Sequence, residues 1–524
     1  MMRRQPVSAY WVLSIIGLAV LTPMAGLLAV GRLPGFEPGD LQFWSSSYIR
    51  RVLLFSFWQA FLSTLISLTL ALLVARSIAK RGDFPLRNLL LRLFGLPLVV
   101  PSIVAVMGII SVYGSAGWFP VGRSLYGLNG ILIAHVFFNL PLAVRLLLPV
   151  WQAIPEHYDQ LAEQLRFTAW QRWIHIEWPT LRENIPGVAL LVFMLCLTSF
   201  AVVLTLGGGP RSSTLEVAIY QSLRFDFDPT QAVVLALLQL MLCLLIAVIG
   251  LSLQKLPEVE ISISVNSQAG AASNRLYHNS VILVTAAFIG MPLLAMIFDA
   301  LRGPVIDVLS DNKLWLAATY TLLIGFAAAF CSVLAGWLLL RTSSVLANHG
   351  KIRQAKWLEL VGSVVYVVPP LILGTGYFVL LSQHVVIADW VFPIVILINS
   401  MMGLPFVIKV LSPVMRKNQM RYDNLCNSLA LHGWNKWRRV DWPLLRKPLG
   451  LAAALVSALA MGDLGVIALF GSADTTTLPL MLYQQLGAYR IPQAAVTALF
   501  LLLLCLLVFW SLERGLGGRK DVTH

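Results

Sequence analysis

The amino-acid sequence predicts an all-α protein that crosses a membrane about 12 times, as two parallel repeats of six helices. Three observations predict this class. Apolar residues make up 58% of the 524 residues and charged residues only 12%, about half the charged fraction of a typical soluble domain. The mean hydropathy is +0.79. A 25-residue polar stretch also occurs twice, which indicates an internal duplication.

Long apolar runs give the predicted spans, because a helix needs about 20 mostly apolar residues to cross a bilayer. Runs of that kind lie at 10–31, 53–75, 90–113, 128–149, 186–206, 231–252, 280–300, 314–340, 360–381, 389–411, 448–470 and 494–512.

These spans define the predicted organisation, in which a segment rich in Ser, Asn, Ala and Gly separates two halves. It comprises an N-terminal helix and outer loop (1–51), a first half (52–252), a cytoplasmic linker (253–279), a seventh helix and outer loop (280–313), a second half (314–513) and a cytoplasmic tail (514–524).

Loop charge predicts the orientation, because cytoplasmic loops carry an excess of Lys and Arg. With both termini cytoplasmic, that side holds 29 of the 38 Lys and Arg residues and the outer side holds the other 9. The same bias explains the net charge of +14 without a nucleic-acid partner. The first run resembles a signal peptide in position, but its apolar stretch of about 20 residues favours an uncleaved helix.

The repeated stretch runs from Tyr158 to Arg182 (the first loop) and from Tyr422 to Arg446 (the second loop). A shift of 264 aligns the two loops without a gap, with 10 identities in 25 positions. Each loop follows the fourth predicted helix of its half, on the cytoplasmic side. An even number of helices separates them, so the repeats run parallel about an axis along the membrane normal, with a transport pathway between the halves.

Each loop reads as two short amphipathic helices that meet near residues 166–169, with Pro179 ending the segment before the next span. One interpretation is a helix pair lying at the lipid headgroups, with Trp and Arg as anchors. The same spacing of Trp and Pro in both copies favours the alternative, two equivalent docking surfaces for a dimeric soluble partner.

The loops resemble the "EAA" loop of ATP-binding-cassette importer permeases, with its pattern of Glu-Ala-Ala, a following Gly and then Leu-Pro. The resemblance implies a coupling helix that docks on each of two ATPase subunits. In this sequence the glutamate and the glycine are replaced in both loops. The implied coupling residues are Gln160, Leu161, Ala162, Leu165, Arg166, Trp170, Trp173 and Pro179 in the first loop, and Asn424, Leu425, Leu429, Ala430, Trp434, Trp437 and Pro443 in the second.

Within that family, the fused two-half form and the stretches Thr205–Leu240 and Met461–Arg490 resemble the thiamine importer permeases. This implies import of thiamine or its phosphates across a bacterial inner membrane, with delivery by a periplasmic binding protein. The fused ferric-iron permeases remain an alternative of the same type.

Motifs for catalysis are missing from the sequence. The stretch Gly515–Lys520 lacks the spacing and the Ser/Thr of a phosphate-binding loop. No sequence pattern for a metal or cofactor occurs, so we expect a transport subunit rather than an enzyme, with ATP used by a partner. A secondary transporter is the alternative from another class, although it would need several acids within the membrane.

Polar residues within the spans are candidates for the substrate path, since such residues are costly in lipid. Asp463 is the clearest, and Ser199 occupies the matching position of the first half; Asn139 and Asn399 lie in the fourth and tenth spans. The alternative is structural: Asp463 would bond to backbone at a kink beside Gly462, and the asparagines would bond neighbouring helices.

Overall fold

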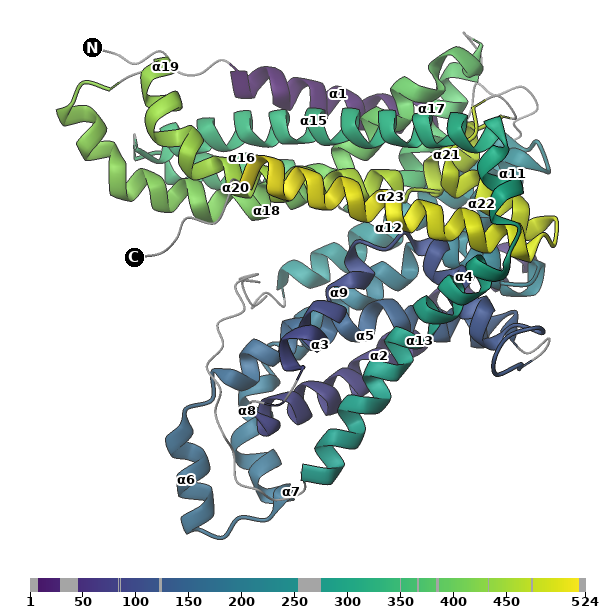
Figure 1. Ribbon diagram of the computed structural model, residues 1–524. Coiled ribbons are helices and arrows are strands. Elements are labelled where there is room, and N and C mark those ends of the chain that lie inside the picture. Colours follow the sequence, from purple (N-terminus) through teal and green to yellow (C-terminus); the bar gives the residue numbers. More distant parts are fainter. Residues whose placement is uncertain are drawn as a thin grey trace. The chain divides into compact units, whose positions relative to one another are not determined.

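The computed structural model describes residues 8–28, 46–82, 84, 86–121, 125–252, 275–348, 350–364, 367–382, 386–431, 433–472 and 475–517. Every regular element in these ranges is a helix (Figure 1), which confirms the all-α class. Within the same ranges, nine helices are long and apolar enough to cross a membrane, or up to ten if a bent pair counts as one span. Most of the predicted linker, 253–274, lies outside the described residues, as do both termini.

The chain divides into two compact units. The first-half unit contains residues 44–218 and 241–303; the second-half unit contains residues 1–43, 219–240 and 304–524. Helices α11 (Leu215–Arg224) and α12 (Pro229–Ser252) pass from one to the other.

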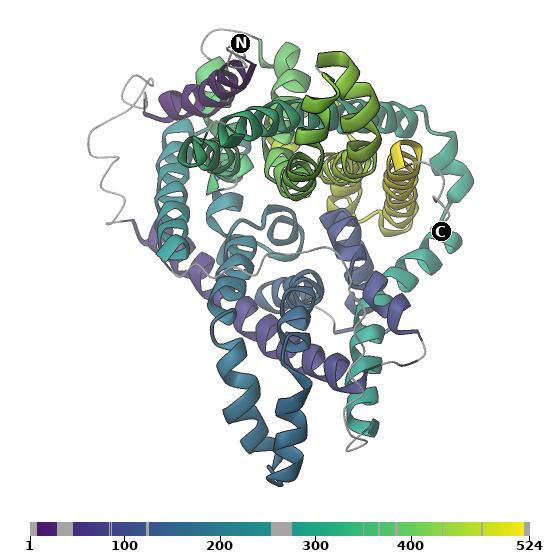
Figure 2. The ribbon, with the colours of Figure 1, turned by 90° about the vertical axis from the view of Figure 1, so that its left-hand side faces the viewer.

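The first-half unit is built around α2 (Ser47–Arg81), which packs along α5 (Leu128–Gln152), α9 (Ile185–Leu197) and α13 (Arg275–Arg302), as Figures 1 and 2 show. It also contains α3 (Arg87–Leu93), α4 (Ser102–Tyr113) and α10 (Phe200–Leu206). Because α13 begins at Arg275, residues 275–279 of the predicted linker are helical.

The second-half unit is built around α15 (Asn312–Asn348), which packs along α18 (Val391–Ser428) and α20 (Trp442–Met461). Its other helices are α1 (Ser8–Leu28), α14 (Val305–Ser310), α16 (Ile352–Val364), α17 (Pro370–Ser382), α21 (Gly465–Phe470), α22 (Leu478–Gly487) and α23 (Ile491–Gly517).

Two helices pack in the unit opposite to the one that their sequence position suggests. Helix α13 leads into the second half but packs against α4 of the first, whereas the N-terminal α1 packs against α17 of the second. Both contacts use a glycine: a Cβ on Gly108 would lie 2.6 Å from the Pro292 carbonyl oxygen, and one on Gly376 would collide with the Pro23 carbonyl. Glycine is therefore required at both crossings.

The predicted spans 90–113, 186–206, 360–381 and 448–470 are not continuous helices. The first is divided into α3, a short 3₁₀ turn and α4, and the third into α16 and α17. Prolines explain these breaks, because Pro97, Pro101 and Pro369 have no N–H for a helical bond. The other two spans divide into α9 and α10, and into α20 and α21.

The two halves repeat specific contacts as well as helices. The Ser56 hydroxyl accepts a hydrogen bond of 2.9 Å from the Leu215 N–H, at the start of α11. In the second half, the Thr321 hydroxyl accepts one of 3.0 Å from the Leu478 N–H, at the start of α22. Each hydroxyl satisfies a backbone donor that the helix itself leaves unpaired.

Candidate functional site

The first loop folds as the predicted pair of short helices. It contains α6 (Glu156–Gln164), a turn, α7 (Ala169–Arg172), a π-helix (η5, Trp173–Glu177) and α8 (Trp178–Leu181). Helices α6 and α7 protrude from the end of the first-half unit (Figure 2). The second loop has the same parts: α18 extends to Ser428 and is followed by α19 (Gly433–Lys436) and a π-helix (η9, Trp437–Asp441).

Helix α6 ends in a Schellman motif, in which a residue in the left-handed conformation closes the last turn. Arg166 has φ +51°. Its N–H donates to the Glu163 carbonyl at 3.0 Å, and the Phe167 N–H donates to the Ala162 carbonyl at 2.9 Å.

The second loop repeats this motif. Ala430 has φ +50°, and the Leu431 N–H donates to the Cys426 carbonyl at 2.8 Å. Arg166 and Ala430 are the positions where the EAA pattern has glycine, which adopts this backbone without the steric cost that a Cβ brings. The turn is therefore kept although the glycine is absent.

The second helix of each loop begins at a defined cap. Thr168 and Gln171 form a capping box at the start of α7: the Gln171 N–H donates to the Thr168 hydroxyl, and the Gln171 side chain accepts from the Thr168 N–H at 2.8 Å. In the second loop, Gly433 starts α19 with φ +59°, at the position that matches Ala169 of the first loop.

The prediction that proline ends the segment is wrong. The chain stays helical through Pro179 to Leu181, and α20 continues from Pro443 without interruption. A π-turn precedes each proline, with the Trp178 N–H bonded to the carbonyl of Trp173, five residues back. The π-turn comes directly before the proline, which has no N–H to donate, and the helix continues through both.

Exposed apolar side chains form a matched face on each loop. The first loop face consists of Leu161, Leu165 and Trp170, which are 48%, 56% and 67% exposed. The second loop face consists of Leu425, Leu429 and Trp434, which are 54%, 61% and 72% exposed. Exposed apolar faces of this kind mark either a docking surface for a protein or a surface that lies against lipid.

The remaining predicted coupling residues divide between surface and interior. Gln160 is exposed, whereas Ala162 is buried under the turn. Trp173 is half-buried, with its ring 6.2 Å from that of Trp151 in α5. Pro179 is also half-buried, and Pro443 is exposed.

In the second loop, Trp437 is half-buried as well, with its ring 4.8 Å from that of Trp337 in α15. The side chain of Asn424 lies outside the described residues. Trp173 and Trp437 thus attach the loops to the membrane helices, while the loop faces point away from them.

One charged residue of the site was not predicted. Glu177, on η5, is only 4% exposed and forms ion pairs with Arg76 at 2.8 Å and Lys80 at 2.6 Å. An acid between two tryptophans of the loop was the available signal in the sequence.

Two candidates for the substrate path, Asn399 and Asp463, contact each other. The Asn399 amide donates to Asp463 at 3.1 Å, and Asp463 accepts from the Gly465 N–H at 3.0 Å, which caps α21. Asp463 also borders a small cavity, about the size of one water molecule, together with Thr321 and Thr477. The structure therefore brings Asn399 and Asp463 together, in the capping arrangement expected of the structural alternative.

The first-half candidates are Asn139 and Ser199. The buried Asn139 amide lies 3.2 Å from the sulfur of Cys196. Ser199 precedes α10 and makes no side-chain cap there. Asn139 thus bonds a neighbouring helix, as the structural alternative predicts.

Equivalent tyrosines of the two halves lie near each other in the second-half unit. Burial, together with the neighbouring Tyr220, raises the pKa of Tyr483 to about 12. Arg224, one turn beyond Tyr220, donates to the Gly471 carbonyl at 2.6 Å. These contacts join α11 to the start of the segment that leads into α22. Among the described residues, no group of three or more His, Cys, Asp or Glu side chains is placed to hold a metal ion.

Known proteins match nearly the whole chain. Residues 49–255 match the family described as "Binding-protein-dependent transport system inner membrane component". The thiamine transport system permease protein ThiP of Escherichia coli is 41% identical over 534 residues, covering 99% of each chain. ThiP of Brucella abortus is 40% identical over 97% of this chain and 95% of its own, and ThiP of Haemophilus influenzae is 39% identical over 90% of each.

These relatives are named as transport permeases, in agreement with the expected transport subunit rather than an enzyme. The family and the apolar helices together make the chain a multi-pass inner-membrane protein. The chain belongs to the family of binding-protein-dependent transport inner membrane components, the membrane subunits of ATP-binding-cassette importers.

Proposed function

We propose that this chain is the permease through which thiamine, or its phosphates, enters the cell in an ATP-driven importer. The observation that carries the proposal is the identity of 41% over 99% of both chains to a protein named as a thiamine transport permease. Agreement over this length leaves no separate region to supply a different specificity.

The partners in this proposal are two copies of an ATPase subunit and one periplasmic binding protein. The matched loop faces support two ATPase copies, because equivalent surfaces on a duplicated chain suit two identical partners. ATP is bound by those partners, and this chain needs no cofactor of its own.

The proposed topology has twelve spans. It counts each broken helix as one crossing, namely α3 with α4, α9 with α10, α16 with α17 and α20 with α21. Both termini and both loops are then cytoplasmic, in accord with the excess of Lys and Arg in the loops on that side. Breaks at matched positions of repeated halves are common where transporters bind their substrate.

The proposed mechanism is alternating access. Closure of the ATPase dimer on ATP moves both docked loops together, and the attached helices open the path outward. Hydrolysis releases the loops and returns the path to the cytoplasmic side.

The test of the substrate uses the complex reconstituted in liposomes with its ATPase and binding protein. We expect binding protein loaded with thiamine, or with a thiamine phosphate, to stimulate ATP hydrolysis, and binding protein loaded with ferric iron to have no effect. Stimulation by iron alone would refute the thiamine assignment and support the iron alternative.

The test of the docking faces uses the double variant Trp170→Asp, Trp434→Asp. A charge in the middle of each apolar face opposes burial against a partner, so the ATPase should no longer co-purify. Gln164→Asp with Asn435→Asp adds the same charges at exposed positions beside the faces and should retain the ATPase. Equal retention in both double variants would contradict the assignment.

A further inference from the structure

A buried glutamate fixes the first loop to a membrane helix. The Glu177 carboxylate lies between two cations of α2: Arg76 Nε at 2.8 Å and Lys80 Nζ at 2.6 Å, with a further bond of 3.2 Å from Arg76 Nη2. The Arg76 guanidinium also lies 5.7 Å from the centre of the Trp173 ring. The end of the first loop, η5, is thereby held against the end of α2.

The same end of α2 is joined to α13. The Ser77 hydroxyl lies 3.2 Å from His278 Nδ1, and Arg81 Nε donates to the Asn279 side chain at 3.0 Å. A movement of η5 would therefore pass through Glu177 to α2 and on to α13.

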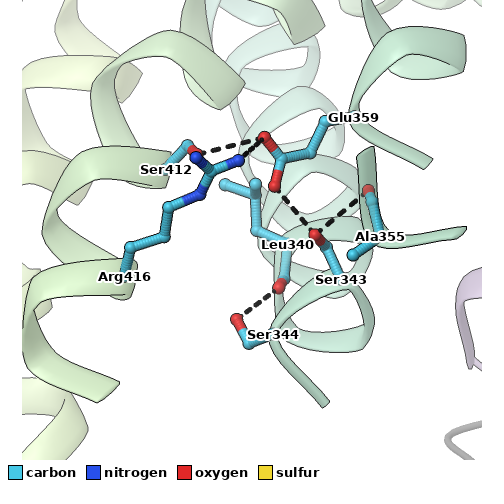
Figure 3. Close-up of polar contacts among 7 residues, drawn as sticks. All are labelled: Leu340, Ser343, Ser344, Ala355, Glu359, Ser412 and Arg416. Carbon is cyan, nitrogen blue, oxygen red and sulfur yellow. Dashed lines mark hydrogen bonds and ion pairs between the residues drawn. The ribbon is translucent and has the colours of Figure 1, made fainter. Parts of the chain in front are cut away.

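The second half holds its loop at a different point, through Glu359 on α16 (Figure 3). One carboxylate oxygen of Glu359 accepts from the Ser343 hydroxyl of α15 at 2.8 Å. The other accepts from Ser412 at 3.2 Å and from Arg416 at 2.7 Å, both on α18. Because α18 runs directly into the second loop, this cluster holds the loop where it begins, whereas Glu177 holds the first loop where it ends.

The contacts of Glu177 and Glu359, here called the two anchors, differ because the two repeats carry different residues at matching positions. Aligning α2 with α15 places the uncharged Val345 opposite Lys80. Aligning the Val-Val-Pro sequences that precede α4 and α17 places Leu91 opposite Glu359. The second half thus keeps the charges that match Glu177 and Arg76, as Asp441 and Arg341, but lacks the one that matches Lys80, and the first half lacks the one that matches Glu359.

We infer that Glu177 and Glu359 are positioning residues for coupling, and that the two loops act on sets of membrane helices that differ beyond the equivalent α2 and α15. The inference rests on the proposed function of the loops as docking sites. The ion pairs of Glu177 are shielded from water, and Glu359, whose side chain is 18% exposed, accepts hydrogen bonds from two serines as well as from the exposed Arg416. Such hydrogen-bonded carboxylates hold a defined geometry, so each transmits movement to the helices that it joins. The first loop moves α2 and α13, and the second loop moves α15 and α16.

The first test measures thiamine imported per ATP hydrolysed in the reconstituted complex. Glu177→Gln and Glu359→Gln should each lower this ratio on the order of tenfold, with the ATPase still bound. Lys80→Gln leaves Glu177 paired with Arg76 and should give a smaller loss, which keeps the test informative if Glu177→Gln does not fold. Glu177→Asp keeps the charge and should restore much of the ratio.

A matched control comes from the same loop. Glu163 is half-exposed and lies 3.9 Å from Arg172, and an exposed pair of this kind contributes little. Glu163→Gln should therefore leave the ratio unchanged. Wild-type ratios in both glutamine variants would overturn the inference.

The second test does not depend on the substrate. ATP is added to the complex, and hydrogen exchange is followed by mass spectrometry. Glu177→Gln should abolish the ATP-dependent change in residues 47–81 and spare that in 352–364; Glu359→Gln should do the reverse. The same loss in both segments with either variant would overturn the asymmetry. A wild type that responds to ATP but not to thiamine would refute only the substrate assignment.

Discussion

Replacing Arg166 or Ala430 by glycine should stabilise the protein, although both residues lie in the candidate coupling loops. The two residues adopt φ values of +51° and +50° at the ends of α6 and α18. An L-residue in this conformation places its Cβ against the neighbouring carbonyl oxygen. Glycine has no Cβ and removes that contact while leaving the hydrogen bonds of the turn in place.

The expected size follows from two opposing terms. Relief of the left-handed backbone contributes about 1–2 kcal/mol per residue, and the added freedom of the unfolded chain costs about 0.4–1 kcal/mol. Each substitution should therefore raise the free energy of unfolding by about 0.5–1 kcal/mol. The two residues lie in separate compact units, so the effects should add.

The measurement is thermal unfolding of the detergent-purified protein, followed by loss of helical circular dichroism. Each glycine variant should unfold about 1–2 °C higher than the wild type. Arg166→Ala removes the long side chain but keeps the Cβ, so it should give no such gain. Gly433→Ala, at φ +59°, should lower the midpoint. Equal effects of Arg166→Gly and Arg166→Ala would refute the explanation through backbone strain.

Three further predictions concern a close helix contact, a buried hydrogen bond at the start of a helix, and the charge of Asp463. Gly108→Ala should destabilise the protein by about 1–3 kcal/mol in thermal unfolding, because the new methyl group meets the Pro292 carbonyl; Gly290→Ala, which has open space around its Cβ position, is the control. Ser56→Ala should cost about 1 kcal/mol by leaving the buried N–H that starts α11 without its acceptor, and an unchanged unfolding midpoint would contradict this. Asp463→Asn keeps an acceptor for the cap of α21, so substrate-stimulated ATP hydrolysis should persist if Asp463 is structural and fall at least tenfold if its charge attracts a cationic substrate.

The sequence allowed prediction of those features that depend on composition and repetition. Apolar runs locate the long helices, and the shift of 264 locates both loops, because duplication preserves spacing even where identity is low. Hydropathy could not reveal the broken spans. A window of apolar residues has the same mean hydropathy whether the helix is continuous or is interrupted at Pro101 and resumes as α4.

The roles of individual loop residues were also beyond sequence reasoning. Trp170 and Trp173 are three residues apart, about 60° around a helix, and helical spacing places them on one ridge. The structure exposes Trp170, whereas Trp173 packs against Trp151 of α5. The two side chains differ because only Trp173 lies on the side of the helix that contacts α5. Glu177 finds its cations in a helix about 100 residues earlier, and no local pattern records a contact of that kind.

The exchange of α1 and α13 between the two units determines the order in which the protein can be completed during its synthesis. The surface of α4 around Gly108 is made early, but its partner Pro292 follows after a further stretch that takes roughly 10–40 s to translate. The delay between synthesis of α1 and synthesis of its partner α17 is longer still. The first-half unit is complete once α13 has been made, at Arg302, before the second half is synthesised. The second-half unit is completed last, with the helix that was made first. A ribosome that stops at the linker therefore leaves the first half without α13, the helix that packs against α4.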